Sequence, residues 1–315
     1  FILSFNTLGL NEELLKAVRQ QCYETSSPIQ KKVIPVILEG KDVLASAQTG
    51  TGKTAGFTLP MLQILSQGQQ MRQRPIRALI LTPTRELAAQ VFDNVKSYGR
   101  FLDLKSAVVF GGVKQNPQAV TLRQGVDVLV ATPGRLLDLH NQKILSLAKV
   151  EILVLDEADR MLDMGFLRDI KKIISFLPAK RQNLLFSATF SKEIRLLAGS
   201  ILNNPIPIEA TPENSTVEKI NQKAYRVEKD QKSAFLIQLI QEGNWKQVLV
   251  FTRTKHGANK LCKSLLSKDI SSLAIHGNKS QQARTKALEG FKNGSIRILV
   301  ATDIASRGID VDMVT

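Results

Sequence analysis

The chain has 315 residues, of which 43% are hydrophobic, and its 43 Lys and Arg against 28 Asp and Glu give a net charge of +15 at pH 7. This composition argues against wholesale disorder, and no apolar run approaches the roughly 18 residues that a membrane-spanning helix needs. Residues 1–200 carry nine more basic than acidic side chains, and residues 201–315 carry six more. Because both parts are basic, a polyanionic partner is favoured, and nucleic acid is the commonest one, although a generically basic soluble protein fits the charge alone equally well.

The two cysteines, Cys22 and Cys262, are too few for a disulfide framework or a zinc cluster. They fit a reducing compartment, and we therefore expect a cytoplasmic protein. The chain begins without Met and stops directly after an acidic turn, so we expect it to be a piece of a longer protein.

Short, continuous apolar runs alternate with segments of helical spacing, such as residues 87–101 and 167–176. Runs of this kind predict strands that are buried on both faces of a parallel sheet, and the alternation predicts a doubly wound α/β architecture. The strands expected in the first part of the chain are Val43–Ala45, Ala78–Leu81, Ala107–Phe110, Val126–Ala131, Ile152–Leu155, Asn183–Phe186 and Ile206–Ile208.

Near residue 203 the sequence becomes rich in turn formers and poor in apolar residues, which indicates a linker. We expect two α/β domains in tandem, over residues 1–204 and 219–315, joined by a linker over residues 205–218, with the second domain incomplete. The strands expected in the second domain are Ala224–Val227, Val248–Phe251, Leu273–Ile275 and Ile296–Val300, and residues 309–314 begin another turn and strand.

The first predicted strand runs into a glycine-rich segment that a helix follows, which is the context of a phosphate-binding loop. Gly50 and Gly52 let the backbone close around phosphate oxygens, while Lys53 offers a cation to the β- and γ-phosphates and Thr54 offers a hydroxyl to Mg²⁺. The segment carries Ala47 where the first glycine is usual. The residues expected to bind the phosphates are Ala47, Gln48, Thr49, Gly50, Thr51, Gly52, Lys53 and Thr54.

Acidic residues follow another buried strand, at the end where α/β sheets bind ligands. Asp156 is placed to hold Mg²⁺, and Glu157 is placed to orient and deprotonate an attacking water. Asp159 by itself also fits a helix cap. Together with the phosphate loop, the pattern favours hydrolysis of a nucleoside triphosphate, with Lys53, Asp156 and Glu157 as the catalytic residues.

These motifs together resemble the DEAD-box family of ATP-dependent RNA helicases over nearly the whole chain, and their detailed strings are most similar to the bacterial RhlE-type subgroup. The motifs that carry the resemblance, beyond the phosphate loop and the acidic run at 156–159, occur in the family's order. They are Phe5 with residues 23–30, then residues 83–87, 111–112, 132–135 and 187–189, and in the second domain residues 250–254, 281–284, 301–303 and 307–310.

The resemblance implies two RecA-like domains with ATP and Mg²⁺ bound in their cleft. It implies that Gln30 reads the edge of the adenine, that Phe5 stacks on its face and that Tyr23 belongs to the same site. A carboxamide donates and accepts together, as adenine requires. Without the resemblance, Gln30 reads as a polar residue at a helix start and Phe5 as a core aromatic. From the second domain, Gly308 and Asp310 are expected at the ribose and phosphates, although Asp310 also fits a turn.

The resemblance also implies single-stranded RNA or an RNA duplex as the partner, bound without sequence preference. Most of the candidate contacts are backbone amides, hydroxyls and arginines, which suit sugar and phosphate rather than base edges. Each arginine could equally be a solvated surface charge. The candidates are Pro83, Arg85, Gly112, Thr132, Pro133 and Arg135 in the first domain and Thr252, Arg253, Gly277, Gln281, Arg284 and Thr302 in the second.

By the same resemblance, Ser187, Ala188 and Thr189 couple the state of ATP to closure of the domains. The sequence departs from the family at Cys22, where glycine is common, and at Ser306, where alanine is usual. The family's last motif, whose arginines act in the transition state, does not occur in the 315 residues. We therefore expect the chain by itself to be impaired in RNA-stimulated ATPase and unwinding.

The sequence thus predicts an ATP-dependent RNA helicase that unwinds short duplexes or remodels RNA–protein complexes. The alternative is an ATP-gated RNA clamp or scaffold without productive unwinding, since both need the same contacts. A related DNA translocase or a small-molecule kinase fits the motifs and the second basic domain less well.

Overall fold

The structure is a computed structural model, and it describes residues 4–46, 50–68, 73–209 and 221–302. The chain divides into two compact units, Phe1–Asn214 and Ser215–Thr315. Each unit is described by itself below. No helix in the described ranges is both long and apolar enough to cross a membrane.

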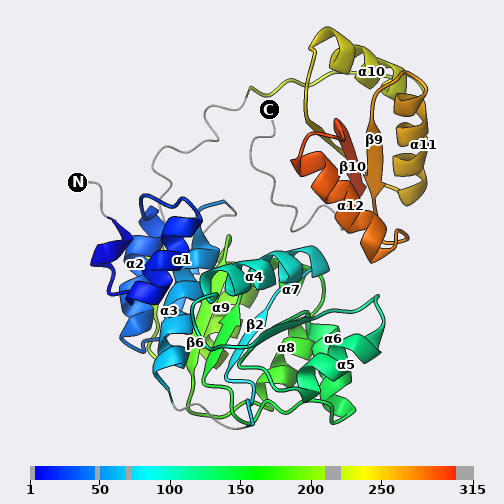
Figure 1. The fold of residues 1–315 in the computed structure, drawn as a ribbon. Coiled ribbons are helices and arrows are strands. Elements are labelled where there is room, and N and C mark those ends of the chain that lie inside the picture. The colour runs from blue at the N-terminus through cyan, green and yellow to red at the C-terminus, as the bar shows by residue number, and fades with distance from the viewer. Residues whose placement is uncertain (1–3, 47–49, 69–72, 210–220, 303–315) are drawn as a thin grey trace. The chain divides into compact units, whose positions relative to one another are not determined.

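The described part of unit 1 contains a parallel sheet of seven strands in the order β3-β4-β2-β5-β6-β1-β7. Two of these strands, β2 and β6, are labelled in Figure 1. All neighbouring strands are parallel, as the continuous apolar runs predict, and β2, β4, β5 and β6 are buried along their whole length. The strands are β1 (Val43–Ser46), β2 (Ala78–Leu81), β3 (Ser106–Val109), β4 (Val128–Ala131), β5 (Ile152–Leu155), β6 (Gln182–Ser187) and β7 (Ile206–Glu209).

Helices cover both faces of this sheet and form two apolar cores. One face is covered by η1 (Phe5–Thr7), α1 (Glu12–Gln20), α2 (Pro28–Leu38), α3 (Lys53–Gln67) and α4 (Arg85–Tyr98). The other face is covered by α5 (Gln115–Arg123), α6 (Pro133–Asn141), α7 (Ala158–Asp163), α8 (Leu167–Ile174) and α9 (Lys192–Ile201). Unit 1 is therefore a three-layer, doubly wound α/β domain.

The described part of unit 2 repeats this plan with a smaller parallel sheet in the order β8-β10-β9. Its elements are α10 (Lys232–Glu242), β8 (Val248–Thr252), α11 (Lys255–Leu266), β9 (Ser272–Ile275), α12 (Gln281–Lys292) and β10 (Ile298–Thr302). The predicted fold class, two doubly wound parallel-sheet domains in tandem, is confirmed.

Two expectations need correction. The strand expected at Ile206–Ile208 is confirmed as β7, which pairs with β1 in the sheet of unit 1, so residues 206–209 do not belong to the linker expected to begin at residue 205. Residues 210–218 lie outside the described ranges. The strand expected at Ala224–Val227 is not found: residues 221–228 form neither helix nor strand. The apolar side chain of Tyr225 instead packs edge-on against Phe235, with ring centroids 5.1 Å apart.

Parallel strands place their carboxyl ends at one edge of each sheet, and that edge gathers the motifs. In unit 1, residue 47 follows β1, Thr82 follows β2, Thr132 follows β4 and Asp156 follows β5, while Ser187 ends β6. The expected chemistry therefore lies where α/β sheets bind ligands.

Candidate nucleotide and RNA site

The loop before α3 is shaped by two glycines with left-handed backbone. Gly50 has φ of 80° and Gly52 has φ of 83°, a region that other residues seldom enter. A Cβ on Gly52 would lie 2.5 Å from Nε2 of Gln30, so a side chain there is also blocked by contact. Ala47, Gln48 and Thr49 lie outside the described residues.

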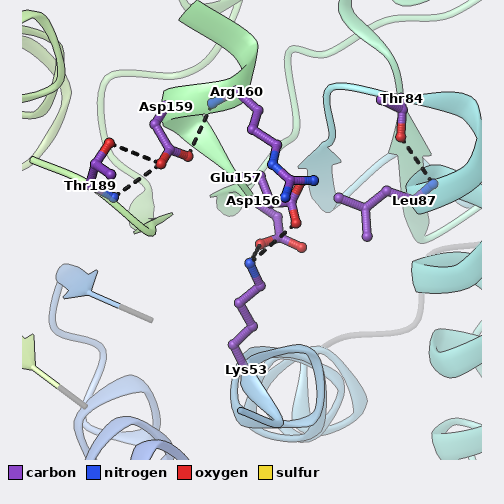
Figure 2. Close-up of polar contacts among 8 residues, drawn as sticks. All are labelled: Lys53, Thr84, Leu87, Asp156, Glu157, Asp159, Arg160 and Thr189. Carbon is purple, nitrogen blue, oxygen red and sulfur yellow. Dashed lines mark hydrogen bonds and ion pairs between the residues drawn. The ribbon is translucent and has the colours of Figure 1, made fainter. Parts of the chain in front are cut away.

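A buried ion cluster lies at the start of α3 (Figure 2). Nζ of Lys53 is 3.3 Å from Oδ1 of Asp156 and 3.6 Å from Oε1 of Glu157. Oε2 of Glu157 is 3.1 Å from the guanidinium of Arg160. Lys53 is 5% exposed, Asp156 0% and Glu157 3%, so water screens these charges poorly.

The carboxylates of this cluster are held by ion pairs and not by well-aligned hydrogen bonds. Within the described residues, Oδ1 of Asp156 and both oxygens of Glu157 meet Lys53 or Arg160 at 3.1–3.6 Å, and none of the four carboxylate oxygens has a hydrogen bond of good geometry. Buried polar oxygens without hydrogen bonds are unusual in folded proteins, and at a site they indicate a ligand. Glu157 also adopts a left-handed backbone at φ 53°, which is strained for a residue with a side chain.

Burial and charge pull the pKa values of this cluster in different directions. For Lys53, burial works to lower the pKa, but the charges of Asp156 and Glu157 outweigh it and hold the pKa above its ordinary value. For Glu157, burial raises the pKa above its ordinary value, with the charge of Lys53 opposing and that of Asp156 adding to the shift. Lys53 is thus a cation, and Glu157 is a stronger base than an exposed glutamate.

Asp159 joins the acidic run to the end of β6 (Figure 2). Its Oδ2 accepts hydrogen bonds from the backbone N–H and the Oγ1 hydroxyl of Thr189, both at 3.0 Å. The Ser187 hydroxyl donates to the carbonyl of Thr189 at 2.7 Å, around the intervening Ala188. Its Oδ1 accepts from the N–H of Arg160, but the N-cap of α7 is Glu157, so Asp159 lies inside the helix and joins it to Thr189.

The Gln30 side chain contacts the glycine-rich loop. Its Oε1 accepts from the N–H of Ser27 at 2.8 Å, and its Nε2 donates to the carbonyl of Gly52 at 2.9 Å. The Ser27 hydroxyl donates to the carbonyl of Thr51 at 2.8 Å. The start of α2 therefore fastens the glycine-rich loop through two side chains, and Thr54, half-buried, follows in the first turn of α3.

Phe5 and Tyr23 line a cavity of about 360 Å³ beside η1 and α1. Their rings stack with centroids 6.4 Å apart, and the Tyr23 hydroxyl lies 3.2 Å from that of Tyr98. Phe5 is buried, whereas Tyr23 is exposed. Cys22 lines the same cavity and has φ of 57°, which is the backbone that the glycine usual at this position would adopt without strain.

The RNA candidates of unit 1 come together at the carboxyl edge of β2, β3 and β4. Pro83 precedes α4 and Arg85 begins it, Thr132 caps α6 and Pro133 begins that helix. The Arg85 guanidinium packs against Gly112, where a Cβ would clash with it. Arg135 donates to the carbonyl of Val113 at 3.1 Å.

The RNA candidates of unit 2 share the carboxyl edge of the second sheet. Thr252 ends β8 and pairs in register with Thr302 at the end of β10, and Arg253 follows β8 directly. Gly277 follows β9, and Gln281 and Arg284 lie in the first turn of α12. Gly308 and Asp310 lie outside the described residues.

Sequence reasoning missed three residues of these sites. Arg160 faces Glu157 from the next turn of α7, and its spacing of three residues was the available signal. Ser27 carries no sequence signal beyond a helix cap, because its contact with Thr51 joins distant segments. His276, beside Gly277, is 2% exposed, and its Nε2 lies 3.1 Å from Oδ1 of Asn259 in α11.

With this geometry in view, the comparisons define the class of protein. Residues 27–197 match the DEAD/DEAH box helicase family, and residues 231–315 match the helicase conserved C-terminal domain. The chain belongs to the DEAD/DEAH box helicase family.

Among similar proteins are the DEAD-box ATP-dependent RNA helicase RhpA of Helicobacter pylori, 44% identical, and the DEAD-box ATP-dependent RNA helicase CshA of Streptococcus pneumoniae, 40% identical. Both matches cover 99% of this chain but only 62% and 59% of the relatives, so the chain spans about three fifths of their length. A solved structure of S. cerevisiae Dbp5 bound to RNA and ADP BeF3 is 31% identical, with a TM-score of 0.83 over 99% of this chain and 79% of that one.

Proposed function

We propose that this protein is an ATP-dependent RNA helicase that hydrolyses ATP to separate short RNA duplexes or to remodel RNA–protein complexes. The observation that carries the proposal is the buried cluster of Lys53, Asp156 and Glu157 beside a loop with two left-handed glycines. A cation, two carboxylates and exposed loop amides are the groups that phosphoryl transfer requires. The relatives that match 99% of the chain are RNA helicases by name.

Mg²⁺ fits the residues present. Asp156 is fully buried, with two oxygens that accept no hydrogen bond from any described residue, and Thr54 offers a hydroxyl at the start of α3. Carboxylate and hydroxyl oxygens are the ligands that this ion prefers. Asp156 and Thr54 would hold the ion, which when bound neutralises charge on the phosphates.

The remaining residues of the cluster act on ATP and water. Lys53, held cationic by two carboxylates, binds the β- and γ-phosphates. Glu157, with its raised pKa, takes the proton of the attacking water, and Arg160 orients its carboxylate from 3.1 Å. When the Lys53 ammonium moves from the carboxylates to the phosphates, Glu157 loses a neighbouring positive charge. Its carboxylate then becomes a stronger base.

In this proposal the adenine base binds against Phe5, Tyr23 and Gln30. Gln30 keeps its bonds to Ser27 and Gly52 and still has one lone pair on Oε1 and one N–H on Nε2. It therefore contacts adenine and the phosphate loop together, and links recognition of the base to the shape of the loop. Gly308 and Asp310 are proposed to touch the ribose and phosphates.

RNA binds along the carboxyl edges of the two sheets, through sugar and phosphate rather than bases. Hydroxyls, arginines and backbone groups predominate among the proposed contacts, so affinity is independent of sequence and falls with salt. The proposed contacts are Pro83, Arg85, Gly112, Thr132, Pro133, Arg135, Thr252, Arg253, Gly277, Gln281, Arg284 and Thr302.

Coupling between ATP and RNA runs through Ser187, Ala188 and Thr189. Asp159 is two residues from Glu157 and binds Thr189 by two hydrogen bonds, so a shift of the acidic run is transmitted to the end of β6. ATP and RNA each favour a closed arrangement of the domains, and by linkage each then strengthens binding of the other. We propose a cytoplasmic location, which two free thiols, Cys22 and Cys262, support.

The test is ATP hydrolysis by a protein that contains the whole chain, with and without oligouridylate RNA and with DNA of matching sequence. We expect stimulation by RNA, no comparable stimulation by DNA, and loss of nucleotide binding in Lys53→Ala. Lys41→Ala, which removes an exposed lysine paired with Glu39 at 2.6 Å, is the matched control. ATPase retained in Lys53→Ala, or equal stimulation by DNA, would contradict the proposal.

The clamp alternative is separated by a second readout. A helicase displaces a labelled strand from a short RNA duplex during ATP turnover. A clamp without unwinding activity leaves the duplex intact, yet it releases RNA slowly in the presence of a nonhydrolysable ATP analogue.

A further inference from the structure

A groove of about 590 Å³ lies on unit 1, away from every residue assigned to the nucleotide and RNA sites. It is bounded by the end of α4, the segment between α4 and β3, and the segment between α5 and β4. Its volume falls in the range of sites that hold a drug-sized ligand or a few side chains of a peptide. Its apolar floor comprises Leu62, Phe92, Val95, Leu102, Leu104 and Val126.

The groove lies at the amino ends of the strands, whereas the nucleotide and RNA sites lie at the carboxyl ends. Lys105 and Ser106 line it where β3 begins, and Val126 and Val128 line it where β4 begins. Helix α4 returns along the sheet from Arg85, at the carboxyl edge, to Gly99 and the groove (Figure 1). A ligand here therefore leaves the nucleotide and RNA sites open.

The charges around the groove are of one sign. Lys96, Arg100 and Lys105 line it, and no aspartate or glutamate is among its lining residues. Asp103, between two lining leucines, directs its carboxylate at Arg74, 2.7 Å away, and Asp127 also pairs with Arg74, at 2.9 Å. Both of these carboxylates are thus paired with Arg74 within the chain. An apolar floor with a cationic rim selects an anionic ligand with apolar groups.

Nucleic acid fits this groove poorly, although the rim is basic. Bases need open aromatic faces for stacking. The aromatic side chain among the groove's lining residues is Phe92, and Nζ of Lys96 lies over its ring, 5.6 Å from the centroid. The floor is mostly aliphatic, which suits leucine or phenylalanine side chains better than bases.

We propose that this groove is a docking site for an acidic peptide segment with large apolar side chains, supplied by a partner protein. The apolar side chains enter the floor, and the carboxylates meet Lys96 and Lys105, whose side chains are exposed. Arg100 contributes less, because one of its guanidinium nitrogens donates to Gln20 at 2.6 Å.

The test is a fluorescence-anisotropy titration of the chain with a short labelled peptide in which Glu and Asp alternate with Leu and Phe. Two matched peptides are controls, one with Gln and Asn for the acids and one with Ser for the apolar residues. The paired variant Lys96→Glu with Lys105→Glu reverses the rim. Lys171→Glu with Lys172→Glu makes the same charge change on exposed positions of α8, outside the groove.

We expect saturable binding of the acidic, apolar peptide and about tenfold or greater weakening in the rim variant. The α8 variant should bind within about twofold of the unchanged chain, and both control peptides should bind much more weakly. Thermal melting followed by circular dichroism checks that both variants remain folded. Equal weakening by both variants, equal binding of the Gln and Asn peptide, or displacement of the peptide by an equimolar amount of oligouridylate would overturn the proposal.

Discussion

Single residues decide the chemistry of this chain, and Glu157 is the clearest example. Its carboxylate is 3% exposed, accepts no hydrogen bond from a described residue, and is balanced by Lys53 at 3.6 Å and Arg160 at 3.1 Å. Burial raises its pKa. Its backbone at φ 53° is strained, which agrees with the catalytic role proposed for this residue.

Glu157→Gln should therefore separate binding from turnover. The amide keeps the size of the side chain but cannot take a proton from water, so nucleotide affinity should stay within a few-fold while hydrolysis falls by about 10²–10⁴. Stopped-flow binding of a fluorescent ATP analogue and a phosphate-release assay measure the two quantities. Glu193→Gln, an exposed change on α9, is the control. Ordinary hydrolysis in Glu157→Gln would refute the assigned role.

The sequence predicted the identity of these residues better than their partners. Lys53, Asp156 and Glu157 stand in contiguous motifs, so spacing was enough. The bond from Gln30 to Gly52 and that from Asp159 to Thr189 join positions 22 and 30 residues apart. Such contacts depend on how the strands are ordered in the sheet, and residue spacing alone does not carry that information.

Among the elements, β1 leads into the glycine-rich loop and β6 ends at Ser187, and Asp42 joins the two strands. Its carboxylate, 6% exposed, accepts from the backbone N–H of Asn183 at 2.8 Å, from the Asn183 side chain at 3.0 Å and from the N–H of Asn203 at 2.8 Å. One side chain thus ties the start of β1 to β6 and to the segment after α9.

Asp42→Ala should destabilise unit 1 by about 3 kcal/mol, because it leaves buried donors without an acceptor. Urea denaturation followed by far-ultraviolet circular dichroism measures this loss. Trp245, the single tryptophan of the chain, lies in unit 2, so its fluorescence serves as an internal control that should not change. Asp93→Ala, at an exposed position of α4, should have little effect. A cost below about 1 kcal/mol for Asp42→Ala would contradict this role.

In unit 2, His276 joins the segment after β9 to α11 through Asn259. Its pKa is lowered by burial and by the charges of Lys279, Lys255 and Arg284. The pKa of an unfolded histidine is about 6.5, and the pKa of folded His276 lies below it. As the pH falls through about 6.5, the unfolded state therefore takes up a proton before the folded state does, which favours unfolding. Its contribution to stability is therefore present above that pH and is lost below it.

We expect the urea midpoint of unit 2, read from Trp245 fluorescence, to fall between pH 7.5 and 5.5. His276→Gln removes the titration but keeps a polar side chain, so its midpoint should change less over the same interval. An identical pH dependence in the variant and in the unchanged chain would show that other groups are responsible.

Strands were predicted well where apolar runs are continuous and buried on both faces, as at β2, β4 and β5. The prediction was wrong at residues 224–227, because a strand also needs a partner to receive its hydrogen bonds, and no described strand pairs there. The helix expected after the phosphate loop is found as α3, and the helix start expected at Gln30 is found in α2. Both helices continue through a proline, Pro60 in α3 and Pro35 in α2, because packing overrides the usual preference of proline to end a helix.

For the whole molecule, the net charge of +15 predicted a polyanionic partner but not where it binds. In our proposal the partner binds at the carboxyl edges of the sheets, where hydroxyls and arginines gather in both units and the phosphate loop lies in unit 1. The groove at the amino ends of β3 and β4 was invisible in the sequence, since its lining comes from segments between residues 62 and 128 that only the fold brings together.

We propose that a nucleotide held by the glycine-rich loop and the buried carboxylates sets the affinity of the whole protein for RNA. The most direct measurement is the dissociation constant of labelled oligouridylate for a protein that contains the whole chain, with and without Mg²⁺ and a nonhydrolysable ATP analogue. We predict binding at least about tenfold tighter with the nucleotide, and no such difference in Lys53→Ala. Equal RNA affinity with and without nucleotide in the unchanged protein would contradict the account.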